Sequence, residues 1–438
     1  MKMGAISLSE EESDQFVSPI FTVPKPDGKR RFILNLKKLN SYLHCPHFKM
    51  EDYRSVLNIM RLNMFMATID LQDAYFHVPV HDSCKKYLKF RFNGILYHFN
   101  CIPFGCCTCP LLFTKLLKPV FEKLRTLGYQ SVRYLDDFLL FGQTFELCSE
   151  NVQATQNLLK SLGFTVNYQK SELLPSKVIK YLGFIFNSLE MTIQLTPNKR
   201  SLIFEFAQKC LLSKSLIIRE AAKLQGYLIS ACPAVQYGLL YTRKLASDIQ
   251  FSLESNNDNY QNRMTLSQEA VSDIHWWQSV IHKAEVSIKE DSFKKVIHTD
   301  ASPFGWGCFC DNDVSHGTWS KSEELLHINA LELLAIERAL TIFANDEGNC
   351  NILLKVDSQV AISYINCYGG CRSELLHAIA KRIWLFCEKK DIFIKATYLE
   401  SKKNVEADFA SRIEVVNSDW MLKSVILSQF VIHLASQL

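Results

Sequence analysis

Glycine and proline are scarce in this sequence, since 438 residues contain only 16 Gly and 12 Pro. Such low counts exclude collagen-like and low-complexity chains. An excess of charge of one sign is also missing, because 49 basic and 45 acidic residues leave a formal net charge of +4. Net charge alone therefore does not identify a nucleic-acid-binding protein, and only local charge can indicate one.

Long apolar runs and a secretory start are absent as well. No uninterrupted apolar stretch reaches the roughly 18 residues that a membrane span needs, and the first residues run directly into Glu10-Glu11-Glu12. In such a chain, 15 cysteines are typical of reduced thiols. We therefore expect a soluble intracellular protein of the cytoplasm or nucleus, with no membrane partner.

The hydrophobic pattern predicts four parts of the chain. Its first part mixes short strand patterns with helical ones, its second is helical, and its third returns to alternating strands and helices, as in an α/β domain. A short apolar tail follows. The predicted boundaries are residues 1–195, 196–290, 291–412 and 413–438.

Within these parts the pattern predicts individual elements. Two hairpins are expected, one from residues 16–23 and 31–36 and one from residues 87–92 and 95–99. Further strands are expected at residues 64–70, 131–135, 138–142, 181–186, 295–300, 305–310, 317–320, 351–356 and 392–398. Helices are expected at residues 50–60, 108–124, 146–162, 325–343 and 404–411.

Three carboxylates are candidates for one site in the first part. Asp136 and Asp137 separate two strand patterns, and Asp70 ends an apolar strand pattern. A lone Asp-Asp pair is usually a solvated turn, but a neighbouring strand ending in Asp70 would bring three acids together. Carboxylates bind Mg²⁺ well, and two such ions can activate an attacking hydroxyl and stabilise a leaving phosphate oxygen. The pattern therefore favours nucleotidyl transfer.

A basic run precedes these carboxylates. Residues 25–38 contain six Lys or Arg residues and one acidic residue, Asp27, for a net charge of +5. The run is either a solvated face or a clamp for a triphosphate and a template backbone.

These motifs resemble those of reverse transcriptases. Residues 65–75 are similar to the first palm motif, and the Tyr-x-Asp-Asp box of the family is matched by Tyr134-Leu135-Asp136-Asp137. The resemblance implies that Asp70, Asp136 and Asp137 are catalytic and bind two Mg²⁺ ions, with Mn²⁺ as a substitute.

The same resemblance implies roles for other residues. Tyr75 falls at the steric gate that selects deoxynucleotides, although its alternative is a core aromatic, and Lys170 falls near the leaving pyrophosphate as a general acid. The other implied nucleotide contacts are Lys25, Arg31, Asp73 and Phe104. The implied primer grip contains Leu182 and Gly183.

One motif departs from most retroviral-type enzymes. The segment Ile102-Pro103-Phe104-Gly105 has Phe104 where those enzymes carry Gln. This form resembles the DIRS group, the retrotransposons that integrate through a tyrosine recombinase. Residues 218–226 and 274–277 are similar to the thumb and connection of that group.

Four further carboxylates lie in the third part of the chain. Asp300 and Asp357 end strand patterns, and Glu332 and Asp408 lie on helical patterns. A single acid on an amphipathic helix is usually solvated, but the four together resemble the active site of ribonuclease H. In that site two Mg²⁺ ions activate water against an RNA phosphate.

One position differs from that family. Tyr398 stands ten residues before Asp408, where the family often has His. Because Tyr does not shuttle protons near neutral pH as His does, we expect slower turnover without histidine-assisted product release.

Several cysteines suggest a metal site at first sight. Cys101, Cys106, Cys107 and Cys109 lie close to His98, but they lack the paired Cys-x-x-Cys repeat of structural zinc sites. Packed thiols are therefore favoured over zinc.

The sequence thus predicts a multidomain α+β and α/β protein, in which a right-hand polymerase with fingers, palm and helical thumb or connection precedes a ribonuclease H-like α/β domain. The predicted activity is RNA- and DNA-directed DNA synthesis from a primer 3′-hydroxyl, coupled to RNA degradation in retrotransposon replication. Its predicted partners are an RNA template, a DNA primer, an RNA–DNA hybrid and dNTPs, and the oligomeric state is left open. The alternative is a domesticated or decayed retroelement protein that binds nucleic acid without catalysis.

Overall fold

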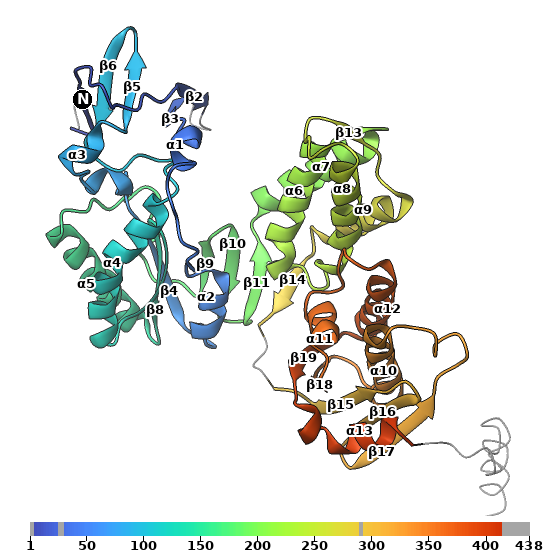
Figure 1. The fold of residues 1–438 in the computed structure, drawn as a ribbon. Coiled ribbons are helices and arrows are strands. Elements are labelled where there is room, and N and C mark those ends of the chain that lie inside the picture. The colour runs from blue at the N-terminus through green and yellow to red at the C-terminus, as the bar shows by residue number, and fades with distance from the viewer. Residues whose placement is uncertain (1–3, 25–29, 289–291, 414–438) are drawn as a thin grey trace, which may run out of the picture. The chain divides into compact units, whose positions relative to one another are not determined.

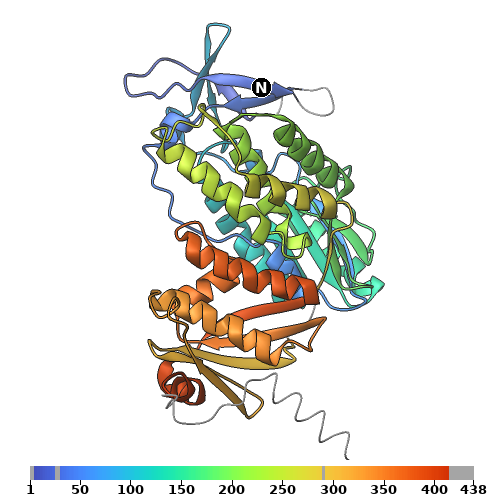
Figure 2. The same ribbon diagram turned by 90° about the vertical axis from the view of Figure 1, so that its right-hand side faces the viewer.

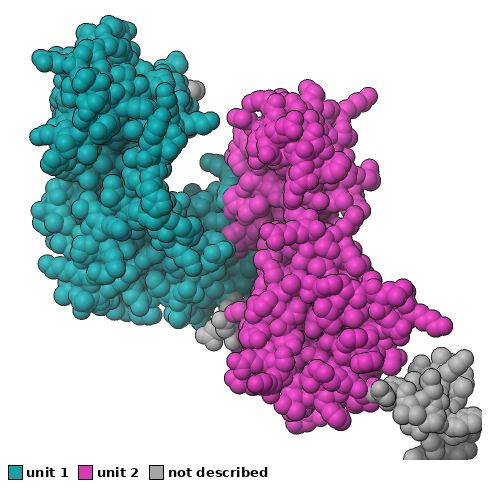
Figure 3. Space-filling model, viewed as in Figure 1, with its two compact units in different colours: residues 1–199, 284–288 teal, residues 200–283, 289–438 magenta. Residues whose placement is uncertain are grey.

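A computed structural model of the protein describes residues 4–24, 30–288 and 292–413. The chain divides into two compact units, one of residues 1–199 with 284–288 and one of residues 200–283 with 289–438 (Figure 3). Most of the predicted helical part is therefore grouped with the C-terminal domain. The four-part division proposed from the sequence stays a prediction, and the tail from residue 414 onward lies outside the described residues.

The first unit begins with two small antiparallel sheets (Figure 1). One joins β1 (Ile6–Leu8), β6 (Ile95–Phe99) and β5 (Lys89–Phe92), and the other pairs β2 (Ile20–Pro24) with β3 (Arg30–Leu34). Both predicted hairpins are confirmed. The hairpin of β5 and β6 turns at Asn93 and Gly94, whose φ angles of 49° and 79° suit an Asn-Gly turn.

A three-stranded sheet forms the centre of the first unit. Its order is β4 (Phe65–Asp70), β8 (Asp137–Gly142) and β7 (Gln130–Tyr134). Helices α4 (Cys109–Thr126) and α5 (Phe145–Ser161) pack on it, and their buried side chains join those of β4 and β8 in one apolar core. The buried residues of α4 recur every three or four positions, which explains why this segment is an amphipathic helix.

The strand predicted at residues 181–186 is wrong as a single element. The chain instead turns at Leu182 and Gly183, with φ angles of 48° and 78°, between β9 (Val178–Tyr181) and β10 (Phe184–Asn187). β11 (Thr192–Leu195) and β14 (Glu285–Ser287) complete this sheet in the order β14-β11-β10-β9. The remaining short elements of the unit are α1 (Lys37–Asn40), α2 (Tyr53–Ile59), η1 (Ala74–His77) and α3 (Asp82–Lys85).

The second unit contains a helical part and a mixed sheet. Its helical part begins within α6, and the larger elements there are α6 (Pro197–Leu212), α7 (Ile218–Ala231), α8 (Arg243–Glu254) and α9 (Gln268–Val280). Two short 3-10 helices and a small sheet connect them, namely η2 (Cys232–Ala234), η3 (Leu240–Thr242), β12 (Leu216–Ile217) and β13 (Arg263–Met264).

The sheet of the second unit has five strands in the order β17-β16-β15-β18-β19. These are β15 (Lys295–Ala301), β16 (Gly305–Cys310), β17 (Asp313–Thr318), β18 (Cys350–Val356) and β19 (Ile392–Tyr398). β15, β18 and β19 run parallel, whereas β16 and β17 are antiparallel. The strand predicted at residues 317–320 is shifted, because the tight turn lies at Asp311 and Asn312, both at positive φ.

Helices cover both faces of this sheet. The helices that follow β17 are α10 (Ile328–Phe343), α11 (Gln359–Asn366), α12 (Glu374–Lys390), η4 (Ser401–Lys403) and α13 (Val405–Ser411). Figure 2 shows α10 and α12 on one side of the sheet and α13, in red, on the other. None of the described helices is long and apolar enough to cross a membrane.

The helical part of the second unit shares a core with α12 and β19. The rings of Tyr241 and Trp276 stack at 3.8 Å, and Trp276 Nε1 donates to Glu388 Oε1 at 3.1 Å. The buried hydroxyl of Tyr237 donates to the carbonyl of Ile392 at 3.1 Å. These ring and polar contacts explain why the two parts form one unit.

Candidate active sites

The first candidate site lies where β4 ends and β8 begins. Asp70, the last residue of β4, pairs in register with Asp137, the first residue of β8. The adjoining turn contains Asp136, whose carbonyl accepts from the Leu71 N–H at 3.0 Å. Leu135 in this turn has φ of 56°, a left-handed conformation that is costly for a non-glycine residue. Backbone pairing therefore holds the three predicted carboxylates at one edge of the sheet.

Burial and mutual repulsion make this cluster ready to accept a cation. Burial, and then the charge of Asp70, raise the pKa of Asp136. Burial, a hydrogen bond with the Asp70 side chain and the charge of Asp136 raise the pKa of Asp137. The Oδ1 atom of Asp70 is buried without a hydrogen-bond partner. A divalent cation would supply the missing partner and relieve the repulsion, so these residues fit one.

Lys170 provides a positive charge beside the carboxylates. Its Nζ lies 3.9 Å from Asp70 Oδ1, and the Lys170 side chain is 70% exposed. The ammonium group therefore reaches the edge of the site from solvent.

The predicted gate residue is packed in the core of the first unit. Tyr75 is 6% exposed, and its ring lies 4.8 Å from that of Phe104 and 5.3 Å from that of Phe113. Phe104 is 45% exposed, and Asp73 precedes η1 with φ of 49°. Burial raises the pKa of Tyr75 to about 12. The burial of Tyr75 is thus compatible with its interpretation as a core aromatic, while its neighbour Phe104 reaches solvent.

The remaining predicted contacts with the nucleotide and primer are Lys25, Arg31, Leu182 and Gly183. Lys25 lies outside the described residues, and Arg31 lies on β3 opposite Val23. Leu182 and Gly183 form the turn of the β9–β10 hairpin. This hairpin contacts the backbone of the first site through Tyr181, whose hydroxyl donates to the Asp137 carbonyl at 3.2 Å. The sequence gives no signal for that contact.

The second candidate site combines three carboxylates from β15, α10 and the end of β18. Ligand atoms of Asp300, Glu332 and Asp357 all lie within 4.8 Å of one another. β15 and β18 are parallel neighbours, so their carboxyl ends meet at the same edge of the sheet. Among the described residues, only these three His, Cys, Asp or Glu side chains meet that spacing. The carboxylates of the first site and the cysteines do not form such a group.

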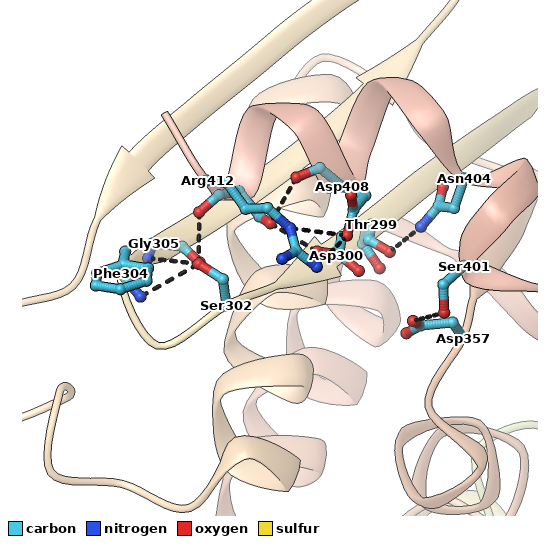
Figure 4. Close-up of polar contacts among 11 residues, drawn as sticks. Thr299, Asp300, Ser302, Phe304, Gly305, Asp357, Ser401, Asn404, Asp408 and Arg412 are labelled. Atoms are coloured by element: carbon cyan, nitrogen blue, oxygen red, sulfur yellow. Dashed lines mark hydrogen bonds and ion pairs between the residues drawn. The ribbon is translucent and has the colours of Figure 1, made fainter. Parts of the chain in front are cut away.

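Asp408 is held differently from the other three. Its Oδ1 accepts from Nη2 and Nε of Arg412 at 2.6 and 3.1 Å (Figure 4). The predicted fourth carboxylate therefore faces a cation of its own helix rather than joining the group of three.

Two serines hold carboxylates of the second site. The Ser411 hydroxyl donates to Asp300 Oδ2 at 2.6 Å, and the Ser401 hydroxyl donates to Asp357 Oδ2 at 2.7 Å. Asn404 fixes the start of α13 by donating to the Thr299 carbonyl at 2.9 Å (Figure 4). Sequence reasoning missed Ser401, Ser411 and Arg412, although the last two lie beside a predicted ligand.

The electrostatics of the second site also fit a divalent cation. Burial, and then the charges of Asp357 and Asp300, raise the pKa of Glu332 to about 9. Burial raises the pKa of Asp300 to about 6, against the opposing hydrogen bond from Ser411. Glu332 Oε2 and Asp357 Oδ1 are buried without a hydrogen-bond partner. Hard oxygen ligands that repel one another and lack partners are the donor set that Mg²⁺ and Mn²⁺ prefer.

Tyr398 stands at the position where the ribonuclease H family often has His. It ends β19 and is 53% exposed.

Glu337, on the same helix as Glu332, pairs with Arg382 through hydrogen bonds of 2.8 and 2.7 Å. It therefore makes a surface ion pair and takes no part in the site.

Comparison with known proteins identifies relatives of the first unit and of the whole chain. Residues 23–186 match the profile of the family described as reverse transcriptase (RNA-dependent DNA polymerase). The enzymatic polyprotein of Cassava vein mosaic virus is 20% identical over 424 residues, which cover 93% of this chain and 62% of that polyprotein. The Gag-Pro-Pol polyprotein of Human T-cell leukemia virus 2 is 30% identical over 192 residues, which cover 41% of this chain and 13% of that polyprotein. The chain thus spans less than two thirds of the length of these relatives.

Solved structures of foamy viral protease-reverse transcriptases share the fold. One, in complex with double-stranded DNA, has a TM-score of 0.55 at 18% identity and covers 90% of this chain and 67% of that chain. Another, in complex with an RNA/DNA hybrid, has a TM-score of 0.55 at 17% identity and covers 97% of this chain and 55% of that chain. The predicted multidomain α+β fold class is therefore confirmed.

The chain thus shares the fold of these structures, and Asp70 and Asp137 lie paired at the end of its central sheet. Residues 23–186 form a reverse transcriptase domain, and the chain is related to retroviral and pararetroviral Pol polyproteins.

Proposed function

We propose that the chain is an RNA- and DNA-directed DNA polymerase that extends a primer 3′-hydroxyl with dNTPs. The observation that carries this proposal is the register of Asp70 against Asp137, with Asp136 in the adjoining turn. Bound Mg²⁺, or Mn²⁺ in its place, would supply activation of the primer hydroxyl and charge neutralisation at the leaving pyrophosphate.

The residues of the chain itself prepare this chemistry. The raised pKa of Asp137 means that its proton leaves as a cation binds. Lys170, 3.9 Å from Asp70, is the proposed proton donor to the leaving pyrophosphate. Lys25, Arg31, Asp73, Tyr75 and Phe104 are the proposed nucleotide contacts, and Leu182 and Gly183 are the proposed primer grip.

We further propose that the second site is a ribonuclease H that degrades the RNA of an RNA–DNA hybrid. The group of Asp300, Glu332 and Asp357 supports this assignment, because it offers unpartnered oxygens to divalent ions that activate water. Asp408 is the proposed fourth ligand, which would exchange Arg412 for a metal ion. Tyr398 does not shuttle protons near neutral pH as His does, so we expect slower turnover without histidine-assisted product release.

The biological role we propose is replication of a retrotransposon of the DIRS group. The Pro-Phe-Gly form around Phe104 favours that group over other retroelements. An intracellular site in the cytoplasm or nucleus stays a prediction, for which the composition of 15 cysteines without a secretory start is the support. The competing hypothesis is a decayed element that binds nucleic acid without catalysis, and unpartnered carboxylate oxygens in both sites disfavour it.

One experiment separates these hypotheses. The purified chain and its Asp136→Asn variant are given an RNA template, a DNA primer, dNTPs and Mg²⁺, and a labelled RNA–DNA hybrid is offered in parallel. We expect primer extension by the wild type alone and RNA cleavage by both proteins. Hybrid binding without either activity would instead support the decayed element.

A further inference from the structure

A pair of cysteines lies where the segment after β6 enters α4. Cys106 and Cys109 are the ends of a β-turn that the Cys109 N–H closes by donating to the Cys106 carbonyl at 3.2 Å. Such turns bring the two terminal Cα atoms within about 7 Å, and disulfides need a Cα separation of about 4.4–6.8 Å. The backbone is thus already compatible with a bond between the two sulfurs.

The side chains of this pair already contact each other. The Cys109 side chain hydrogen-bonds the Cys106 side chain, and the Thr108 hydroxyl lies 3.3 Å from Cys106 Sγ. These contacts lower the pKa of Cys106, and the same pairing together with burial raises the pKa of Cys109. Cys106 is half-buried and Cys109 is buried, and a lowered pKa at the more accessible sulfur is typical of a reactive dithiol.

The backbone around the pair is fixed by α1. The Asn40 side chain donates to the Gly105 carbonyl at 2.9 Å and accepts from the Cys107 N–H at 3.0 Å. This clamp holds the two residues that flank Cys106, so the turn is presented in one conformation.

The pair also lies between two apolar cores of the first unit. Cys109 belongs to the buried cluster that contains Tyr75, and Cys106 packs both against that cluster and against the cluster of Leu34, Leu36 and Phe99. A change at the pair would therefore be transmitted directly to the ring of Tyr75.

We propose that Cys106 and Cys109 form a redox-active dithiol that a hydroperoxide converts to an intramolecular disulfide. The Cys106 thiolate attacks the peroxide, which breaks the O–O bond and gives a sulfenic acid and an alkoxide, or hydroxide when the oxidant is hydrogen peroxide. The Cys109 sulfur then attacks the Cys106 sulfur, its proton leaves with the sulfenic hydroxyl as water, and the S–S bond forms. The two thiols lose two electrons and the peroxide gains them.

The consequence for polymerase activity rests on the proposed function. The disulfide removes the hydrogen bond between Thr108 and Cys106 and draws Cys106 towards Cys109, which belongs to the same buried cluster as Tyr75. Because interiors are close-packed, this shift displaces the aromatic group of Tyr75 and Phe104. We expect oxidation to lower primer extension reversibly.

Mass spectrometry of the full chain tests the dithiol without any assay of activity. The protein is treated with one equivalent of hydrogen peroxide at pH 6.5, its remaining thiols are alkylated, and the tryptic peptide of residues 92–115 is sequenced. We expect a peptide lacking two hydrogens, with Cys106 and Cys109 unalkylated and Cys101 and Cys107 alkylated. Cys107→Ser should keep this product, whereas Cys109→Ser, which lacks the second sulfur, should abolish it and leave an oxidised Cys106.

Other pairings or reactivities would overturn the proposal. A bond between Cys45 and Cys107, whose atoms also approach each other, would do so, as would preferential oxidation of the exposed Cys84 or Cys367. Primer extension by the oxidised wild type should fall at least about fivefold and return with dithiothreitol, whereas Cys106→Ser should not respond. A chain that never extends primers would contradict the proposed polymerase function, while the peptide masses would still decide the dithiol.

Discussion

The hydroxyl of Ser411 donates a 2.6 Å hydrogen bond to Oδ2 of Asp300, although 111 residues separate them. Ser411 is 1% exposed and Asp300 is 4% exposed. The same serine donates to the Asp408 carbonyl at 2.9 Å. One buried hydroxyl therefore connects α13 to the carboxylate of β15 and orients it towards Glu332 and Asp357.

Removing this hydroxyl should weaken the second site without emptying it. Partners of metal ligands typically contribute about 10–100-fold to metal affinity or activity, so Ser411→Ala should lower both Mn²⁺ affinity and hybrid cleavage within that range. Titration calorimetry with Mn²⁺ measures the first and labelled-RNA cleavage the second. Ser279→Ala, at an exposed serine that bonds within α9, is the matched control. Wild-type values in Ser411→Ala would show that Asp300 needs no such support.

The two sites should be separable by single substitutions, since their carboxylates come from different units. Asp137→Asn removes one charge of the first site while keeping its shape, so primer extension should fall at least about 100-fold. Hybrid cleavage should stay within about twofold of the wild type. Asp300→Asn is the reciprocal variant, with the opposite expectation. Loss of both activities in either variant would indicate misfolding or one shared site.

The sequence predicted the positions of the acidic residues better than it predicted the side chains that hydrogen-bond to them or pair with them. Asp70 and Asp357 end strands whose apolar pattern is unambiguous, so their placement followed from strand boundaries. The turn at Leu182 was missed because residues 181–186 are mainly apolar, and Leu gives no signal for positive φ. Ser411 was missed because its partner Asp300 depends on how α13 packs on β15, which local sequence does not encode. Arg412 pairs with Asp408 four residues earlier, a helical spacing that sequence reasoning could have used.

Glu332 should make the protein less stable as pH rises. Its pKa is raised from 4.5 to about 9 in the folded chain. Below pH 4.5 the Glu332 carboxyl is protonated in both the folded and the unfolded state. Between pH 4.5 and about 9 this carboxyl ionises readily only in the unfolded state. The free energy of unfolding therefore falls as pH rises towards 9. One pKa unit corresponds to about 1.4 kcal/mol, so Glu332→Gln should be more stable than the wild type at pH 8 by at least about 1 kcal/mol.

Urea unfolding at pH 4.5 and pH 8 measures this difference. The difference in unfolding free energy between Glu332→Gln and the wild type should nearly vanish at pH 4.5. At pH 8, Mg²⁺ should stabilise the wild type more than Glu332→Gln, because a bound cation compensates the buried charge. Glu337→Gln alters a carboxylate of the same helix that pairs with Arg382, and it controls for surface charge. A stability gain of equal size at both pH values would contradict a perturbed Glu332.

The ring of Tyr75 should have two separable roles, in packing and in sugar selection. It is 6% exposed and lies against Phe104 and Phe113, so Tyr75→Ala should cost about 3–5 kcal/mol of unfolding free energy, as large core truncations do. Tyr75→Phe keeps the ring and removes only the hydroxyl. If the ring excludes a 2′-hydroxyl, Phe should retain the preference for dNTPs, whereas Ala should raise the ratio of kcat/KM for ribonucleotides over deoxynucleotides at least about tenfold. Tyr75→Val, which leaves a smaller cavity, should show the same change in selectivity at a lower cost in stability. Equal selectivity in all three variants, measured by single-nucleotide extension, would leave Tyr75 as a core aromatic alone.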